Sequence, residues 1–123
     1  MNNHPQREMP FVAVVKGPQE VPLEFIKACK SELEALNLCI NLSGMSAEAI
    51  GDKLGIDKGH FSRITKGRGN FPTNRRVQLM ELCGNLAPAQ YEAWKVGRDL
   101  VERSKDVRIA ELTAELERLK VAA

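Results

Sequence analysis

The residues of this chain that could do chemistry are cations gathered in one short segment. Residues 57–76 contain six Lys or Arg residues and a single acid, Asp57. The whole chain carries 18 Lys and Arg against 16 Asp and Glu, a net charge of +2, so the positive charge is local rather than general. A focused basic patch of this kind is what a polyanion-binding face requires.

Glycine and positive charge together permit two interpretations of the stretch "DKGHFSRITKGRGNFP". It is either a glycine-rich loop that cradles a nucleotide phosphate or a short helix presented to the phosphates of DNA. A phosphate loop is poorly supported, because the spacing from Gly44 to Gly51 is wrong and Lys53 is not followed by Ser or Thr. No nucleophile–base–acid set is visible either. We therefore predict no enzymatic activity and no cofactor.

Metal binding and membrane insertion are also disfavoured by the sequence. The three cysteines, Cys29, Cys39 and Cys83, form no CxxC motif, and His4 and His60 are the only histidines. The cysteines are typical of small, reduced core residues. The apolar run at residues 11–15 is too short for a signal peptide or a membrane span. We expect a cytoplasmic protein with no metal and no membrane contact.

The elements that must position the cations are predicted to be helices, about five in number, in an all-α fold. One helix is expected from Pro22 to just before Ser43-Gly44, since its apolar residues recur at intervals of three and four. Further helices are expected over 47–54, 58–66 and from about 72 to Gly84, followed by a long one from Pro88. The predicted organisation is a flexible N-terminal arm (1–20), a helical domain (21–87) and a long C-terminal helix (88–123).

The two short helices and the turn between them have the pattern of a helix-turn-helix. Small residues fall where two steeply crossed helices approach and where the turn needs a left-handed backbone. Apolar residues fall on the inward faces. The predicted motif core is Ile50, Gly51, Leu54, Gly55, Ile56, Phe61 and Ile64.

The outward face of the second motif helix follows from the step of 100° per residue. With Phe61 and Ile64 inward, the residues that point away are Gly59, Ser62, Arg63 and Lys66, and Lys58 lies at the exposed N-terminal end. Helices enter the DNA major groove with such N-terminal side chains near base edges, where Arg and Lys pair with guanine N7 and O6. We predict Lys58, Ser62 and Arg63 as base readers, with Gly59 allowing close approach.

Residues around this helix are candidates for backbone contacts. Lys66, Arg68 and Asn70 are predicted to contact phosphates. Arg75 and Arg76 either form a solvated face or also contact phosphates at the start of the next helix. His60 lies at the flank of the helix and either touches DNA or packs beside the first motif helix.

The stretch "MSAEAIGDKLGIDKGHFSRITKG" resembles the lambda-repressor-like helix-turn-helix regulators, the XRE or Cro/CI family of phages and bacteria. The shared elements are Ser46, Glu48, Leu54-Gly55-Ile56, Ser62-Arg63-Ile64 and Gly67, and the similarity covers residues 30–86. The resemblance implies that the start of the second motif helix reads operator bases. This chain has Ala47 where the family often has a phosphate-binding Gln, and Gly59 where the second base reader is often polar.

The C-terminal segment carries an apolar stripe. Its members are spaced by three, four and three residues, as heptad positions a, d, a and d: Ile109, Leu112, Leu116 and Leu119. The stripe either packs on the chain's own core or joins two copies. We favour dimerisation, because the flanking residues are highly charged.

These observations predict a sequence-specific DNA-binding transcriptional regulator, a dimeric repressor that binds a palindromic operator. The alternative is an antitoxin-type DNA-binding protein whose N-terminal arm, "MPFVAVVKG", also binds a second protein. A protein-binding adaptor on the same fold is a third hypothesis.

Overall fold

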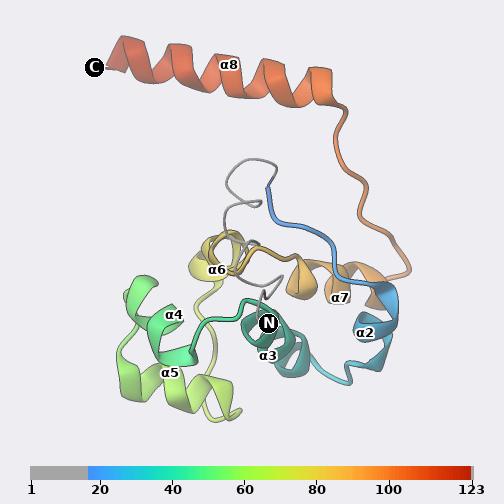
Figure 1. The fold of residues 1–123 in the computed structure, drawn as a ribbon, viewed down its shortest axis with the longest axis vertical. Coiled ribbons are helices and arrows are strands. Elements are labelled where there is room, and N and C mark those ends of the chain that lie inside the picture. The colour runs from blue at the N-terminus through green and yellow to red at the C-terminus, as the bar shows by residue number, and fades with distance from the viewer. Residues whose placement is uncertain (1–16, 123) are drawn as a thin grey trace, which may run out of the picture.

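The computed structural model describes residues 17–122, and within that range the chain is all-α (Figure 1). The expected arm over residues 1–16, with its apolar run, lies outside the described residues. Seven α-helices and one 3₁₀ turn follow one another: α2 (Leu23–Ala28), α3 (Glu32–Leu42), α4 (Ala47–Lys53), α5 (Lys58–Thr65), η1 (Thr73–Arg75), α6 (Arg76–Cys83), α7 (Ala87–Lys95) and α8 (Lys105–Ala122).

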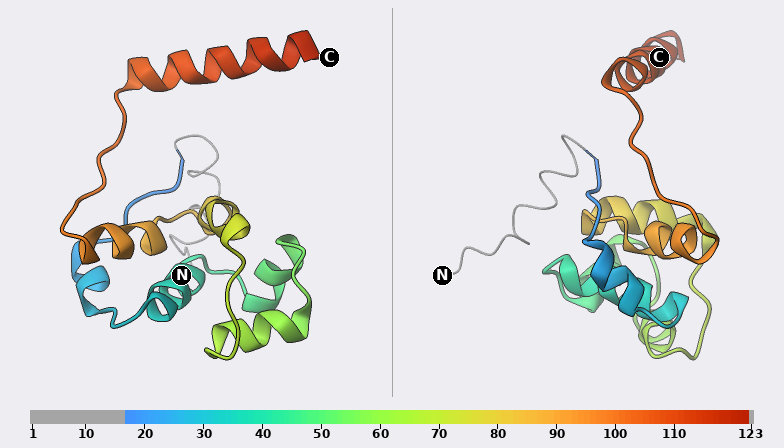
Figure 2. Two further views of the ribbon diagram at one scale, coloured as in Figure 1. Left: turned by 180° about the vertical axis from the view of Figure 1, so that it is seen from behind. Right: turned by 90° about the vertical axis from the view of Figure 1, so that its right-hand side faces the viewer.

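Helix α3 lies at the centre of the helical body. It packs against α5, α6 and α7, while α4 and α5 form one end and α8 stands apart at the other (Figures 1 and 2). The buried side of α3 consists of Ala35, Leu36, Cys39 and Ile40. The core that surrounds it is completed by apolar residues of every other helix except α8, together with Val21 just before α2.

The expected single helix from Pro22 to Leu42 is wrong, because the chain breaks between α2 and α3. Ser31 caps the new helix: its Oγ accepts the backbone N–H of Glu34 at 3.2 Å. Glu34 reciprocates, since its Oε1 accepts the N–H of Lys30 at 2.8 Å. This exchange satisfies donors that a continuous helix would have used. The apolar spacing that suggested one helix is kept, since Ile26 and Leu36 still reach the same core.

The expected continuous helix from Pro88 onward is also wrong. Gly97 adopts a positive φ of +76° and ends α7, and residues 98–104 are not helical. Helix α7 belongs to the body, where Ala87, Gln90 and Tyr91 are buried. Only α8 is the long C-terminal helix, and the two views in Figure 2 show it separated from the body by the segment that follows α7.

Residues 17–20, expected as part of the arm, are held against the body. The N–H of Gln19 donates to the carbonyl of Gly84, and the Gln19 carbonyl accepts from the N–H of Leu86, both at 3.0 Å. The side chain of Gln90 then pairs with both backbone groups of Val21, at 2.7 and 2.9 Å. These contacts give the described residues their one isolated β-bridge, Gln19 with Asn85, and no strand.

The cysteines occupy buried or partly buried positions of the kind that small apolar residues fill. Cys39 and Cys83 are fully buried, on α3 and α6, and Cys29 is partly buried. A hydrogen bond with the Cys83 thiol, together with burial, raises the pKa of Cys39, so this thiol stays protonated at neutral pH. Among the described residues no group of three or more His, Cys, Asp or Glu could hold a metal ion.

Candidate nucleic-acid interface

Helices α4 and α5 are each started by a side-chain cap. Ser46 Oγ accepts the N–H of Ala49 at 3.1 Å. Asp57 Oδ2 accepts two amides of α5, those of Gly59 at 3.1 Å and His60 at 3.2 Å. Both caps stabilise the start of their helix, because Ser and Asp side chains satisfy the free amides of a first helical turn.

The turn between the two helices depends on Gly55. Its φ of +72° lies in the left-handed region that glycine adopts without steric cost. The chain then reverses so that the N–H of Ile56 donates to the carbonyl of Gly51 at 2.9 Å. The five apolar residues predicted for the motif core, Ile50, Leu54, Ile56, Phe61 and Ile64, are all buried.

Gly51 marks the closest approach of α4 and α5. A Cβ at this position would lie 2.9 Å from Cδ2 of Phe61, closer than carbon atoms pack. The Phe61 ring also meets Phe71 edge to face, with ring centroids 6.5 Å apart. Phe61 therefore packs against both the backbone of α4 and a second ring, and these contacts restrict the rotation of α5 about its axis.

The C-terminal end of α5 is attached to α3. The side-chain amide of Asn37 donates to the carbonyl of Thr65 at 3.0 Å. Gly67, with φ +82°, leaves room for Leu33, whose Cδ2 would lie 3.1 Å from a Cβ at the glycine. Helix α5 is thus capped at one end and anchored to the central helix at the other.

With its inward face fixed, α5 presents its other side to solvent. The residues predicted for that side are all exposed: Lys58, Gly59, Ser62, Arg63 and Lys66. The Arg63 guanidinium extends back over the glycine, since Nη1 would lie 3.6 Å from a Cβ at Gly59. Arg63 forms no ion pair within residues 17–122, so its guanidinium donors are available to an acceptor outside the chain.

Lys58 differs from Arg63 in having a partner. Its Nζ lies 2.9 Å from Oε2 of Glu48, in the first turn of α4. The hydrogen bond and the charge of Glu48 raise the pKa of Lys58 above its usual value. Glu48 was not predicted as a site residue. Glu48 is one of the residues that the sequence shares with the helix-turn-helix pattern. The contact of its carboxylate with Lys58 could not be predicted, because it depends on how α4 and α5 cross.

The predicted flanking residues separate into two groups. Lys66, Arg68 and Asn70 are exposed in the turn and loop after α5. His60 is half-buried and packs over that loop, with Cε1 3.7 Å from where a Cβ of Gly69 would be. His60 thus packs on the loop after α5.

Arg75 and Arg76 point to different parts of the molecule. Arg75 is half-buried beside the α4–α5 turn, with Nη2 3.8 Å from a Cβ position at Gly55. Arg76 binds Glu92 of α7 through Nη1 and Oε2, 2.5 Å apart. This ion pair commits Arg76 to the body, so Arg75 is the better candidate for a phosphate contact.

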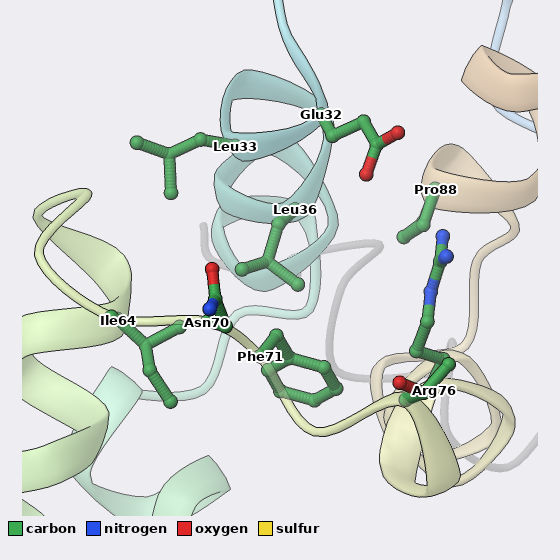
Figure 3. A pocket seen from close by; sticks show the side chains of 10 residues that line it. Glu32, Leu33, Leu36, Ile64, Asn70, Phe71, Arg76 and Pro88 are labelled. Carbon is green, nitrogen blue, oxygen red and sulfur yellow. The ribbon is translucent and has the colours of Figure 1, made fainter.

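A hollow of about 410 Å³ lies behind α5, between α3 and the loop that leads to α6 (Figure 3). Its floor is apolar, with Leu36, Ile64 and Phe71, and Glu32 and Arg76 stand at its rim (Figure 3). The Arg76 guanidinium is already paired with Glu92. No buried side-chain polar atom in the described part of the chain lacks a hydrogen-bond partner.

The apolar stripe of α8 does not pack on the body. Its members, Ile109, Leu112, Leu116 and Leu119, keep between 51% and 60% of their surface exposed. Of the two alternatives drawn from the sequence, packing on the chain's own core is therefore wrong. No helix in residues 17–122 is both long and apolar enough to cross a membrane.

Comparison of the chain with models of protein families, with curated proteins and with solved structures finds no match. The functional assignment therefore rests on the residues of this chain and their geometry.

Proposed function

We propose that this protein is a sequence-specific, dimeric DNA-binding transcriptional regulator, a repressor that places α5 in the major groove of a palindromic operator. The observation that carries the proposal is the outward face of α5. That face is basic and solvent-exposed, while the opposite face is locked into the core by Phe61 and Ile64. The resemblance to lambda-repressor-like regulators supports the same assignment.

The dimensions of α5 suit this role. An α-helix with its side chains is about 10–12 Å across, and a B-DNA major groove about 12 Å wide admits it. The eight residues of α5 extend roughly 12 Å along the helix axis. Arg63 is the proposed main base reader, with Lys58 and Ser62 beside it. Lys66, Arg68, Asn70 and Arg75 are proposed to hold the phosphates on either side.

Dimerisation is part of the proposal. One short helix reads few bases, whereas a two-fold dimer reads two half-sites about 34 Å apart. The exposed stripe of α8 is the proposed dimer contact. Because α8 stands apart from α4 and α5 (Figure 1), it can join two copies without covering either basic face.

The test is a binding titration by fluorescence anisotropy at physiological salt. The probes are the DNA upstream of the protein's own gene, a duplex selected from a random library, and scrambled duplexes of equal length. Arg63→Ala should weaken the selected duplex by about tenfold or more per half-site, since a bidentate contact contributes about 1–3 kcal/mol. Scrambled DNA should lose much less.

Arg98→Ala is the matched control. Arg98 is exposed just after α7, a helix that lies away from α5 across the body (Figure 1), and its loss removes the same charge. Absence of any preference by the wild-type protein among these probes overturns the proposed function. An equal loss on all probes in Arg63→Ala reduces Arg63 to a phosphate contact.

A further inference from the structure

The carboxylate of Glu48 contacts the ammonium of Lys58 on the face proposed to meet DNA. Glu48 Oε2 lies 2.9 Å from Lys58 Nζ, and the side chains of Glu48 and Lys58 are 65% and 77% exposed, respectively. The contact bridges the two helices of the motif, since Glu48 lies in the first turn of α4 and Lys58 is the first residue of α5. Helices α4 and α5 lie next to each other at this end of the body (Figure 1).

Local helix energetics do not explain a lysine at this position. The first residue of a helix lies at the positive end of the helix dipole, where a cation is unfavourable and an acid is favoured. An exposed ion pair adds little to folding stability, because water and salt screen it. The pair is better explained by what it does to the position of the Lys58 ammonium.

The Glu48 carboxylate affects base edges and phosphates differently. A lysine ammonium has three N–H donors on a flexible four-carbon chain. When Glu48 accepts a hydrogen bond from one of these donors, two donors remain for guanine N7 and O6. The Lys58 side chain also loses part of its conformational freedom before DNA binds. The same carboxylate repels neighbouring phosphates and competes with them for the ammonium.

We propose that Glu48 is a positioning residue for Lys58, which directs its ammonium toward base edges and away from phosphates. The consequence is DNA binding that is weaker in total and more selective for sequence. This inference rests on the DNA-binding function proposed above, and it adds a residue outside the set that contacts DNA directly.

The test compares Glu48→Gln with the wild-type protein on operator and random duplexes over a range of salt concentrations. The substitution keeps the size of the side chain and removes its charge. Random DNA should bind roughly threefold more tightly between low and physiological salt, and the salt slope should steepen by about 0.9, the value for one added phosphate contact. Operator affinity should change less, so the ratio of specific to random binding falls.

Two further variants isolate the role of Lys58. In a Lys58→Met background, Glu48→Gln should leave the salt slope unchanged, because the ammonium it controls is gone. Asp52→Asn removes another exposed carboxylate of α4, one that forms no ion pair among the described residues, and it should leave both the slope and the ratio unchanged. Equal effects of Glu48→Gln with and without Lys58, or an equal effect of Asp52→Asn, overturn the positioning role.

A measurement without DNA separates this inference from the proposed function. Glu48 raises the pKa of Lys58, so an NMR titration of the Lys58 side chain should show that pKa falling in Glu48→Gln. DNA binding without this shift overturns the role of Glu48 alone. The shift without any DNA binding overturns the proposed function, and the positioning role with it.

Discussion

Gly51 of α4 lies directly against the ring of Phe61 of α5, so closely that a Cβ on the glycine would stand 2.9 Å from Cδ2, 3.0 Å from Cγ and 3.2 Å from Cβ of Phe61. The crossing of the two motif helices is set by this contact. Because these atoms are the Cβ and two ring carbons of the buried Phe61, they cannot move aside without moving α5.

Gly51→Ala should therefore lower the free energy of unfolding by about 1 kcal/mol. Alanine in a helix gains about 1 kcal/mol over glycine, but an overpacked core costs about 1–3 kcal/mol, and here the second effect is the larger. Gly51→Val should cost more. Urea unfolding followed by circular dichroism measures both changes.

The matched control is Gly59→Ala, the same substitution at an exposed position of α5. Its Cβ would meet only Asp57 Oδ2 at 3.4 Å and Arg63 Nη1 at 3.6 Å, so stability should be unchanged or slightly raised. In a Phe61→Leu background the cost of Gly51→Ala should disappear. Equal effects of the two glycine substitutions would falsify the close contact between Gly51 and Phe61.

The motif could be predicted from the sequence because its determinants are local. A cap needs only a Ser or Asp before a helix, and the turn needs only a glycine at the left-handed position, as Gly55 shows. The inward and outward faces of α5 follow from helical periodicity once Phe61 is taken as buried. These features are determined by residues that lie close together in the sequence.

The helix breaks were harder to predict, because two local signals conflict there. The apolar spacing through Cys29 favours one continuous helix, while the Ser31–Glu34 exchange favours a new start, and the structure follows the cap. A glycine is tolerated inside many helices at a cost of about 1 kcal/mol, so the sequence alone did not show that α7 ends at Gly97.

Contacts between residues far apart in the sequence could not be predicted from apolar spacing or from capping residues. Arg76 and Glu92 are 16 residues apart, and only the fold, in which α6 and α7 both pack against α3, brings them together. Glu48 reaches Lys58 for the same kind of reason. The sequence therefore predicted which face of α5 is exposed and which cations belong to the candidate site. It did not predict which of those cations already form ion pairs.

Arg75→Ala and Arg76→Ala should have opposite consequences. Arg76 is tied to Glu92, so its loss should lower the free energy of unfolding by about 0.5 kcal/mol, a value discounted for solvent exposure, and leave the salt dependence of DNA binding unchanged. Arg75→Ala should leave stability unchanged and reduce the salt slope by about 0.9 per half-site.

Salt titrations of DNA binding, together with urea unfolding, distinguish these two outcomes. Glu92→Gln is the control for the ion pair, and it should reproduce the stability loss of Arg76→Ala without altering DNA binding. A reduced salt slope in Arg76→Ala would instead place that residue among the phosphate contacts.

Asn85→Ala should destabilise the body strongly. The side chain of Asn85 is fully buried, its amide donates to the carbonyl of Cys39 at 3.1 Å, and its Oδ1 accepts the N–H of Ala87 at 3.2 Å. Removing it leaves both backbone groups unpaired in the core, at a cost of about 2–4 kcal/mol.

Asn41→Ala is the comparison for this change. Asn41 is exposed on α3, and its substitution should alter stability by less than about 0.5 kcal/mol. Urea unfolding of the two variants reports the difference directly. A small effect at Asn85 would mean that the α6–α7 connection tolerates unpaired backbone groups.

Leu116→Glu should convert the proposed dimer into a monomer without unfolding the body. Leu116 is 60% exposed in the isolated chain, so the substitution removes no contact within the body and its melting temperature should stay the same. Helix α8 has 18 residues, and most of the stability of a helix in a protein comes from packing of its apolar face rather than from helix propensity. Loss of the partner should therefore also lower the helical signal in circular dichroism.

Analytical ultracentrifugation measures the mass, and binding to a palindromic operator measures the consequence. The monomeric variant should bind one half-site and lose its dependence on half-site spacing, because nothing then holds two α5 helices about 34 Å apart. Ala114→Glu, on the same helix but outside the apolar stripe, is the control and should remain dimeric. A wild-type protein that sediments as a monomer at micromolar concentration, or an Ala114→Glu variant that dissociates equally, would show that the stripe is not the dimer contact.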